Sequence, residues 1–140
     1  MTTVRLVAIR ETPLSVDEVI AAVSDPAAGG LAVFIGTVRD VDGGKPVDVL
    51  GYSAHPSAEE QMRTLCESIA ERFPAVAVAA VHRVGDLAVG DLAVVVAAAC
   101  GHRGEAFEAA RALIDELKAT VPIWKHQVFS DGSDEWVGVP

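Results

Sequence analysis

Four of the eleven basic residues in this acidic chain fall in three short stretches whose composition suits an anion pocket. Arg39 ends an apolar stretch with a glycine inside it, Arg103 follows a Gly-His pair, and Lys118 and Lys125 flank a Pro-Ile-Trp segment. Because the formal net charge is −9, grouped cations predict a bound negative ligand. Two neighbouring lysines also destabilise each other's charged form, which would make one amine more reactive.

The two lysines have both a chemical and a structural interpretation. Counted at 100° per residue from Phe107, Lys118 lies at the edge of an apolar helical stripe, and Pro122 then turns the chain so that Lys125 could return towards it. Alternatively, Lys118 is a favourable cation at a helix C-terminus with its stem on the apolar surface, and Lys125 is a solvated strand lysine. The sequence leaves both interpretations open.

The arginines and His102 have the same two interpretations. Backbone N–H groups at a helix start, together with Arg103, would form an anion site, and His102 could act as a general acid or an anion donor. In the structural alternative, Arg103 pairs with a nearby acid such as Glu105, and Arg39 pairs with Asp40.

Other kinds of site find little support. No histidine has a Cys or His three or four residues away, so zinc ligation is not expected, and no cofactor motif is present. We interpret the segment from His82 to Asp86 as a strand end and turn with a structural role. Cys66 and Cys100 lack CxxC spacing and are expected to be buried free thiols in a reducing cytoplasm.

Charge and hydropathy exclude two classes of partner. An acidic chain lacks the basic face that nucleic acid or an anionic membrane surface requires. No apolar run reaches the roughly 18–20 residues that cross a bilayer, and the N-terminus lacks the features of a signal peptide.

The pattern of elements predicts one α+β domain over residues 1–140. Capping boxes begin predicted helices at Ser15 and Ser57, which extend to about residues 24 and 73, and a third helix spans about 105–119 with Phe107 in its apolar stripe. Strands are predicted at 4–10, 31–38, 47–54, 76–83, 92–99 and 123–129 and around Trp136, with a mobile loop at 40–46. Two strands follow each helix, which favours mostly antiparallel pairing.

Together these pieces resemble the catalytic, larger subunit of molybdopterin synthase. They occur in the family's order and cover nearly the whole chain from about residue 30. The Lys-x6-Lys spacing around Pro-x-Trp is the most specific of them. The matching segments are Phe34–Asp40, Tyr52–Pro56, His82–Gly85, Gly101–Arg103, Leu117–Lys125 and Asp134–Trp136.

The resemblance implies a function, a fold and a set of partners. The family adds two sulfurs to cyclic pyranopterin monophosphate as a dithiolene, taking them from the C-terminal Gly-Gly thiocarboxylate of a small ubiquitin-like protein. It implies an α/β hammerhead-type fold and a homodimer within a heterotetramer. Many members also lend a basic residue from one subunit to the neighbouring subunit's site. This chain contains no donor segment, so the sulfur carrier is expected to be a separate protein.

The resemblance also implies roles for individual residues. Lys118 would meet the carrier's tail as a proton-transfer or acyl-contacting group, and Lys125 would bind substrate and stabilise charge. The remaining substrate-binding residues would be Thr37, Val38, Arg39, His102, Arg103, His126 and Gln127.

Two other functions stay open. The same residues could form a non-catalytic module that binds the acidic C-terminal tail of a ubiquitin-like partner. A phosphoester hydrolase would need a metal cluster or a nucleophile, and the sequence shows neither.

Overall fold

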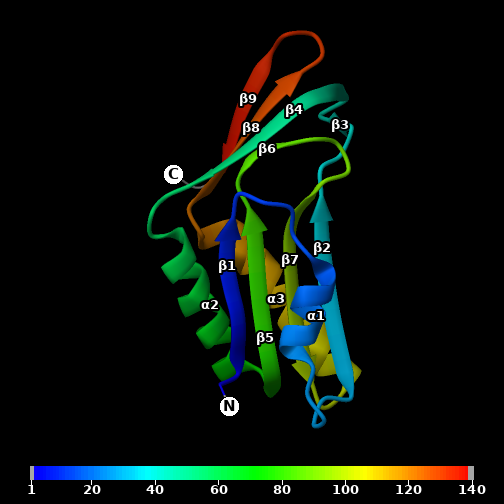
Figure 1. Cartoon of the computed structure of the whole chain (residues 1–140), viewed down its shortest axis with the longest axis vertical. Helices are drawn as coiled ribbons and strands as arrows, with labels where there is room; N and C mark the ends of the chain where they lie inside the picture. Colours follow the sequence, from blue (N-terminus) through cyan, green and yellow to red (C-terminus); the bar gives the residue numbers. More distant parts are fainter. Residues whose placement is uncertain (1, 139–140) are drawn as a thin grey trace.

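A computed structural model describes residues 2–138. Its centre is a four-stranded sheet in the order β1-β5-β7-β2, formed by Val4–Arg10, Ala75–Arg83, Leu92–Cys100 and Gly30–Thr37 (Figure 1). The β1–β5 pair is parallel, and the other two pairs are antiparallel. The strand β2 is therefore an edge strand.

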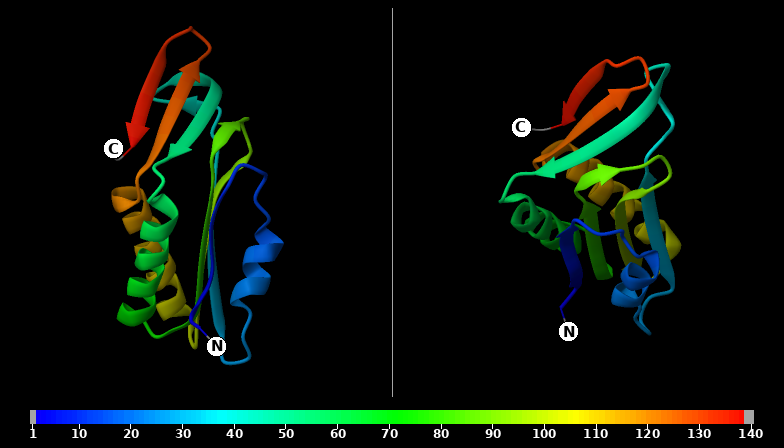
Figure 2. Two further views of the ribbon diagram at one scale, coloured as in Figure 1. Left: turned by 60° about the vertical axis from the view of Figure 1, so that its left-hand side comes forward. Right: turned by 45° about the horizontal axis from the view of Figure 1, so that its top comes forward.

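Helices cover both faces of this sheet. Figure 2 shows α1 (Val16–Val23) on one face and α2 (Ala58–Arg72) and α3 (Arg103–Thr120) on the other. Because the inner strands β5 and β7 lie between these layers, they are almost continuous runs of buried Ala and Val. Small side chains there allow the helices to pack closely on the strands.

A second, five-stranded sheet lies at one end of the molecule (Figure 1). Its order is β3-β4-β8-β9, formed by Val41–Asp42, Lys45–Ala54, Ile123–Phe129 and Asp134–Gly138, and β6 (Gly85–Leu87) also pairs with β4. The turn between β3 and β4 is Gly43-Gly44, and both have positive φ (59° and 78°), as a two-residue hairpin turn requires.

The predicted α+β class, the helices and the seven predicted strands are confirmed, with boundaries shifted by two residues or fewer. The expected loop at 40–46 is instead a short hairpin, and β6 was not predicted. At Ser15 the expected cap forms, since its hydroxyl accepts from the Glu18 N–H. At Ser57 the predicted capping bond is wrong, because its hydroxyl contacts His55 and Gln61 instead.

The long helix α3 connects the two ends of the molecule. It begins against β2, where a side chain at Gly30 would place its Cβ 2.9 Å from the Cα of Arg103. It ends at Thr120, and the chain then turns through Pro122 into β8 of the second sheet. The fold therefore carries Lys118 to the junction between the two sheets.

Candidate active site

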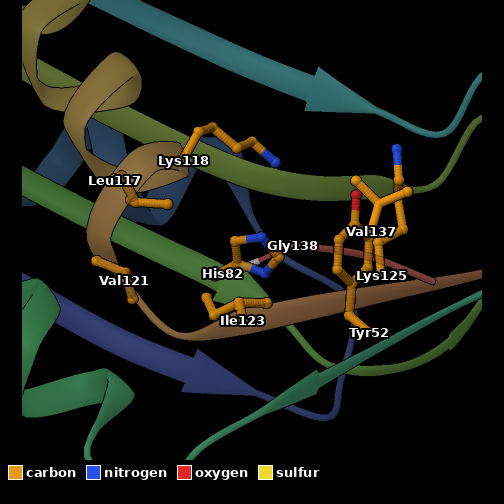
Figure 3. Close-up of a pocket in the computed structure, with 9 residues that line it drawn as sticks. All are labelled: Tyr52, His82, Leu117, Lys118, Val121, Ile123, Lys125, Val137 and Gly138. Atoms are coloured by element: carbon orange, nitrogen blue, oxygen red, sulfur yellow. The ribbon is translucent and has the colours of Figure 1, made fainter. Parts of the chain in front are cut away.

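The cavity beside Lys118 occupies this junction. It has a volume of about 230 Å³ and takes residues from α3, β4, β5, β8 and β9, most of them apolar (Figure 3). We call it the lysine cavity. It is lined by Tyr52, His82, Leu117, Lys118, Val121, Ile123, Lys125, Val137 and Gly138.

Lys118 and Lys125 both line this cavity, as the sequence predicted. The Lys118 Nζ lies 5.8 Å from the centre of the Tyr52 ring. Loss of hydration, and then the Lys125 charge, lower the pKa of the Lys118 amine. Part of Lys118 remains solvent-accessible, so the amine can meet a ligand that enters the cavity.

A second cavity adjoins the first and shares Tyr52 and Lys125 with it. It is small, about 50 Å³, and polar. We call it the anion wall. Its residues are Thr37, Val38, Arg39, Asp42, Leu50, Tyr52, Lys125 and Gln127, so four of the predicted ligands besides Lys125 line it.

Asp42 is the unexpected member of the anion wall. Its carboxylate accepts a hydrogen bond from Gln127 Nε2 at 2.5 Å and one from Arg39 Nη2 at 3.3 Å. The Gln127 bond is the main reason that the pKa of Asp42 is lowered, and the charges of Lys125 and Arg39 add to it. An internal anion therefore occupies the polar groups that were predicted to hold an external one.

Val38 shapes the wall without offering a free polar group. Its N–H donates to the Asp91 carbonyl, its carbonyl accepts from the Gly90 N–H, and its side chain is buried in a small core. Thr37 and Arg39 are exposed on either side of it.

His102 and Arg103 lie at the other end of α3. Fifteen residues separate Arg103 from Lys118, which corresponds to about 22 Å along the helix. One chain therefore does not bring all four cations into one pocket. Both residues are exposed, beside Gly30 and far from the lysine cavity.

Known proteins resemble this chain closely. A family model described as "MoaE protein" matches residues 9–120. The chain is 49% identical over 136 residues to molybdopterin synthase catalytic subunit 1 of Mycobacterium tuberculosis, covering 93% of this chain and 88% of that protein. The Halalkalibacterium halodurans molybdopterin synthase catalytic subunit is 43% identical over 132 residues, covering 94% and 84%.

This chain belongs to the MoaE family.

The fold agrees. The crystal structure of molybdopterin synthase from Staphylococcus aureus matches with a TM-score of 0.89 at 30% identity, covering 95% of this chain and 97% of that one. The predicted family and function class, a molybdopterin synthase catalytic subunit that acts in molybdenum cofactor biosynthesis, are confirmed. The predicted roles of individual residues remain predictions.

In this MoaE family member, His126 does not face the lysine cavity or the anion wall. Side chains alternate along β8, so Lys125 and Gln127 share one face and His126 lies on the other. Its ring stacks on Trp136, with centroids 4.3 Å apart, and its Nε2 lies 2.9 Å from Asp134 Oδ2. Within one chain, the His126 side chain therefore lines neither cavity, and its role in substrate binding stays a prediction.

His82 was predicted to be structural, yet it lines the lysine cavity. It is 1% exposed, and burial lowers its pKa to about 4, so the imidazole is neutral at pH 7. The sequence signal for His82 was the segment from His82 to Gly85, which matches the family's pattern. For Asp42, the sequence showed only an Asp-Gly-Gly turn, which does not predict a place on the anion wall.

The described residues give two further negative findings. Between residues 2 and 138, no group of three His, Cys, Asp or Glu side chains converges in a way that could hold a metal ion. None of the helices in that range combines the length and apolar character needed to cross a bilayer.

Proposed function

We propose that this chain transfers sulfur from the C-terminal Gly-Gly thiocarboxylate of a small ubiquitin-like protein to cyclic pyranopterin monophosphate, forming the dithiolene of molybdopterin. The observation that carries the proposal is the pairing of Lys118 and Lys125 in one cavity, with the Lys118 amine partly desolvated beside a wall of anion-binding side chains.

The lysine cavity suits the tail of the sulfur carrier. Glycines have no side chains, so a Gly-Gly end can enter a narrow space between Leu117, Val121 and Ile123. Its thiocarboxylate would then meet Lys118. The ammonium form of that lysine offsets the charge of the sulfur and of an oxyanion that develops at the acyl carbon, and the lowered pKa allows it to exchange a proton.

The anion wall suits the phosphate and pterin of the substrate. Arg39 and Lys125 supply positive charge, and Thr37 and Gln127 supply polar groups. Because the two cavities share Lys125, a substrate on the wall would lie next to the tail that delivers sulfur. Holding the two reactants adjacent removes much of the entropic cost of their meeting.

We further propose a homodimer that restores His102 and Arg103 to the site. In support, the edge strand β2 exposes Leu31, Phe34 and Ile35, and α3 exposes Phe107, which belongs to the predicted apolar stripe of that helix. An apolar groove of about 350 Å³ runs between β2 and α3. It is lined by Ala32, Val33, Phe34, Phe107, Ala110, Arg111 and Ile114.

A two-fold axis through this groove would pair opposite ends of the two α3 helices. Ala110 and Arg111 lie halfway between Arg103 and Lys118 along the helix. Antiparallel packing about that point would place Arg103 of the partner subunit level with Lys118. The cations that one chain separates would then form one site from two copies.

Complementation between inactive variants tests this dimer. Lys118→Ala and Arg103→Ala should each be impaired, but a mixture that exchanges copies at random should recover about a quarter of wild-type activity, since half the dimers would contain one intact site. Lys118→Ala mixed with Arg39→Ala is the control, because the proposal takes both residues from the same copy. Each site of a mixed dimer would then lack either Lys118 or Arg39, so this mixture should recover no activity. Recovery with the Arg39 variant and none with the Arg103 variant would contradict the shared site.

The sulfur carrier is proposed to be a separate small protein. A solved Helicobacter pylori structure is described as a protein–protein complex of subunits 1 and 2 of molybdopterin-converting factor; it matches with a TM-score of 0.70 at 17% identity, which supports a shared fold. We also propose that the reaction occurs in the reducing cytoplasm, consistent with the free, buried thiols of Cys66 and Cys100.

Reconstitution tests the proposed function. The protein is incubated with cyclic pyranopterin monophosphate and a thiocarboxylated ubiquitin-like partner, and dithiolene product is measured. We expect product with the intact partner, and neither product nor a tight complex with a partner that lacks its last two residues. Tight, tail-dependent binding without product would favour the non-catalytic module, and equal affinity for the truncated partner would refute insertion of the tail.

A further inference from the structure

We propose that the Nε2 atom of His82 accepts a hydrogen bond from a backbone N–H of the carrier's C-terminal Gly-Gly tail. This inference rests on the proposed function, since it concerns how the lysine cavity holds that tail. It assigns a binding role to a residue whose sequence context indicated only a strand end and turn.

The contacts of the imidazole determine which nitrogen can accept. His82 Nδ1 lies 2.7 Å from the carbonyl oxygen of Arg83. A carbonyl can only accept, so Nδ1 carries the proton and donates it, and Nε2 of the neutral ring is a bare acceptor. Burial keeps the ring neutral at pH 7, because the pKa of His82 is lowered to about 4.

The ring is held in place. Tyr52 packs edge-on against it, with ring centroids 4.9 Å apart and an angle of 75° between the planes. Figure 3 shows the imidazole among the cavity residues, between the Lys118 side chain and Ile123. Within residues 2–138, the hydrogen bond found for this ring is that of Nδ1, and none is found for Nε2. Nε2 is not among the fully buried atoms that lack a partner, so it keeps some solvent contact although His82 as a whole is 1% exposed. A ligand that supplied a donor would satisfy this nitrogen.

The polar groups of the cavity are otherwise mostly donors. The ammonium groups of Lys118 and Lys125 can only donate, and they suit an anionic thiocarboxylate. A Gly-Gly end also brings amide N–H groups, which lose their water on entering an apolar cavity and need an acceptor. His82 Nε2 and the hydroxyl of Tyr52 are the side-chain atoms of the lining that can accept.

A double-mutant cycle tests the bond. The carrier is made by chemical ligation with its terminal Gly-Gly intact, or with one glycine at a time replaced by sarcosine, which lacks the N–H. Calorimetry then measures binding to wild type, His82→Phe and Tyr52→Phe. We expect sarcosine at one of the two positions to weaken binding to wild type about tenfold, and His82→Phe to weaken binding of the intact tail by about the same factor.

The effective sarcosine and His82→Phe together should weaken binding little more than either change alone. In Tyr52→Phe, the same sarcosine should still weaken binding by its full factor. If the losses of affinity caused by sarcosine and by His82→Phe multiply at both glycine positions, the role of His82 is overturned. If His82→Phe does not fold, the wild-type titrations still decide, since the proposal fails when neither sarcosine weakens binding. His82→Gln, which can place an oxygen near Nε2, should recover much of the affinity. If the intact tail does not bind at all, the proposed function itself fails. If the intact tail binds and neither sarcosine weakens that binding, only the role of His82 fails.

Discussion

The two adjoining cavities differ in how their side chains are held. The lysine cavity is built on core packing, since His82, Leu117 and Val121 are each no more than 2% exposed. On the anion wall, the Arg39 side chain is 74% exposed and is held by Asp42 from a hairpin whose first strand has only two residues. The comparison indicates that the fold fixes the residues packed around the Lys118 amine, whose own side chain is exposed, and leaves the groups proposed to bind substrate freer to adjust.

The strongest test of this contrast removes the Lys118 amine. Lys118→Ala should lower the rate of product formation by about 10²–10⁴-fold, the usual cost of losing a positioned proton-transfer group. Its melting temperature should stay close to that of wild type. Lys45→Ala is the matched control, because Lys45 lies outside both cavities and pairs with Asp131. Turnover of the Lys118 variant within a few-fold of wild type would show that the catalytic assignment is wrong.

The packed cavity should also affect stability in acid. Because the pKa of His82 is about 4 in the folded protein and about 6.5 when unfolded, the unfolded chain takes up a proton between these values and the folded protein does not. This contribution is fully present above pH 6.5 and is lost as the pH falls to 4, by about 3 kcal/mol. Urea unfolding across this range should show that loss in wild type and in His55→Gln, which alters an exposed histidine, but not in His82→Phe.

On the anion wall, removal of charge should affect binding more than folding. Arg39→Ala and Lys125→Ala should each weaken substrate binding by about 1–3 kcal/mol, the range for a charge-assisted hydrogen bond, and Arg103→Ala should do so through the proposed dimer. Substrate titrations and melting curves would check this. Large losses of melting temperature with unchanged substrate affinity would instead identify these cations as structural ion-pair residues.

The smallest expected effect concerns Asp42. Asp42→Asn removes the negative charge that pairs with Arg39 and repels an incoming phosphate, so it should tighten substrate binding by about 1 kcal/mol or less, as for other exposed ion pairs. Asp40→Asn makes the same charge change on an exposed neighbour outside the wall and should have less effect. Weaker substrate binding by Asp42→Asn would mean that the carboxylate positions the wall for substrate.

Sequence reasoning located the parts of the site that depend on local order. The turn at Pro122 is encoded in a few residues, so the approach of Lys118 and Lys125 was predictable. The position of Asp42 depends on the register of a hairpin that pairs Asp42 with Lys45. The face occupied by His126 depends on where β8 begins, because a shift of one residue reverses every side chain of a strand. The predicted helix over about residues 105–119 already implied a long separation between Arg103 and Lys118, but the grouping of cations in the sequence favoured one pocket.

The junction of α3 with Gly30 has a mechanical consequence. In the proposed dimer, each α3 carries the lysine of one reaction centre at its C-terminal end and the arginine of the other centre at its start. A helix is stiff along its axis, so a tilt caused by a ligand at one end would move the residue at the other. Because the two reaction centres would share the same pair of α3 helices, they could not respond independently. Ligand binding at one centre would shift residues at the other.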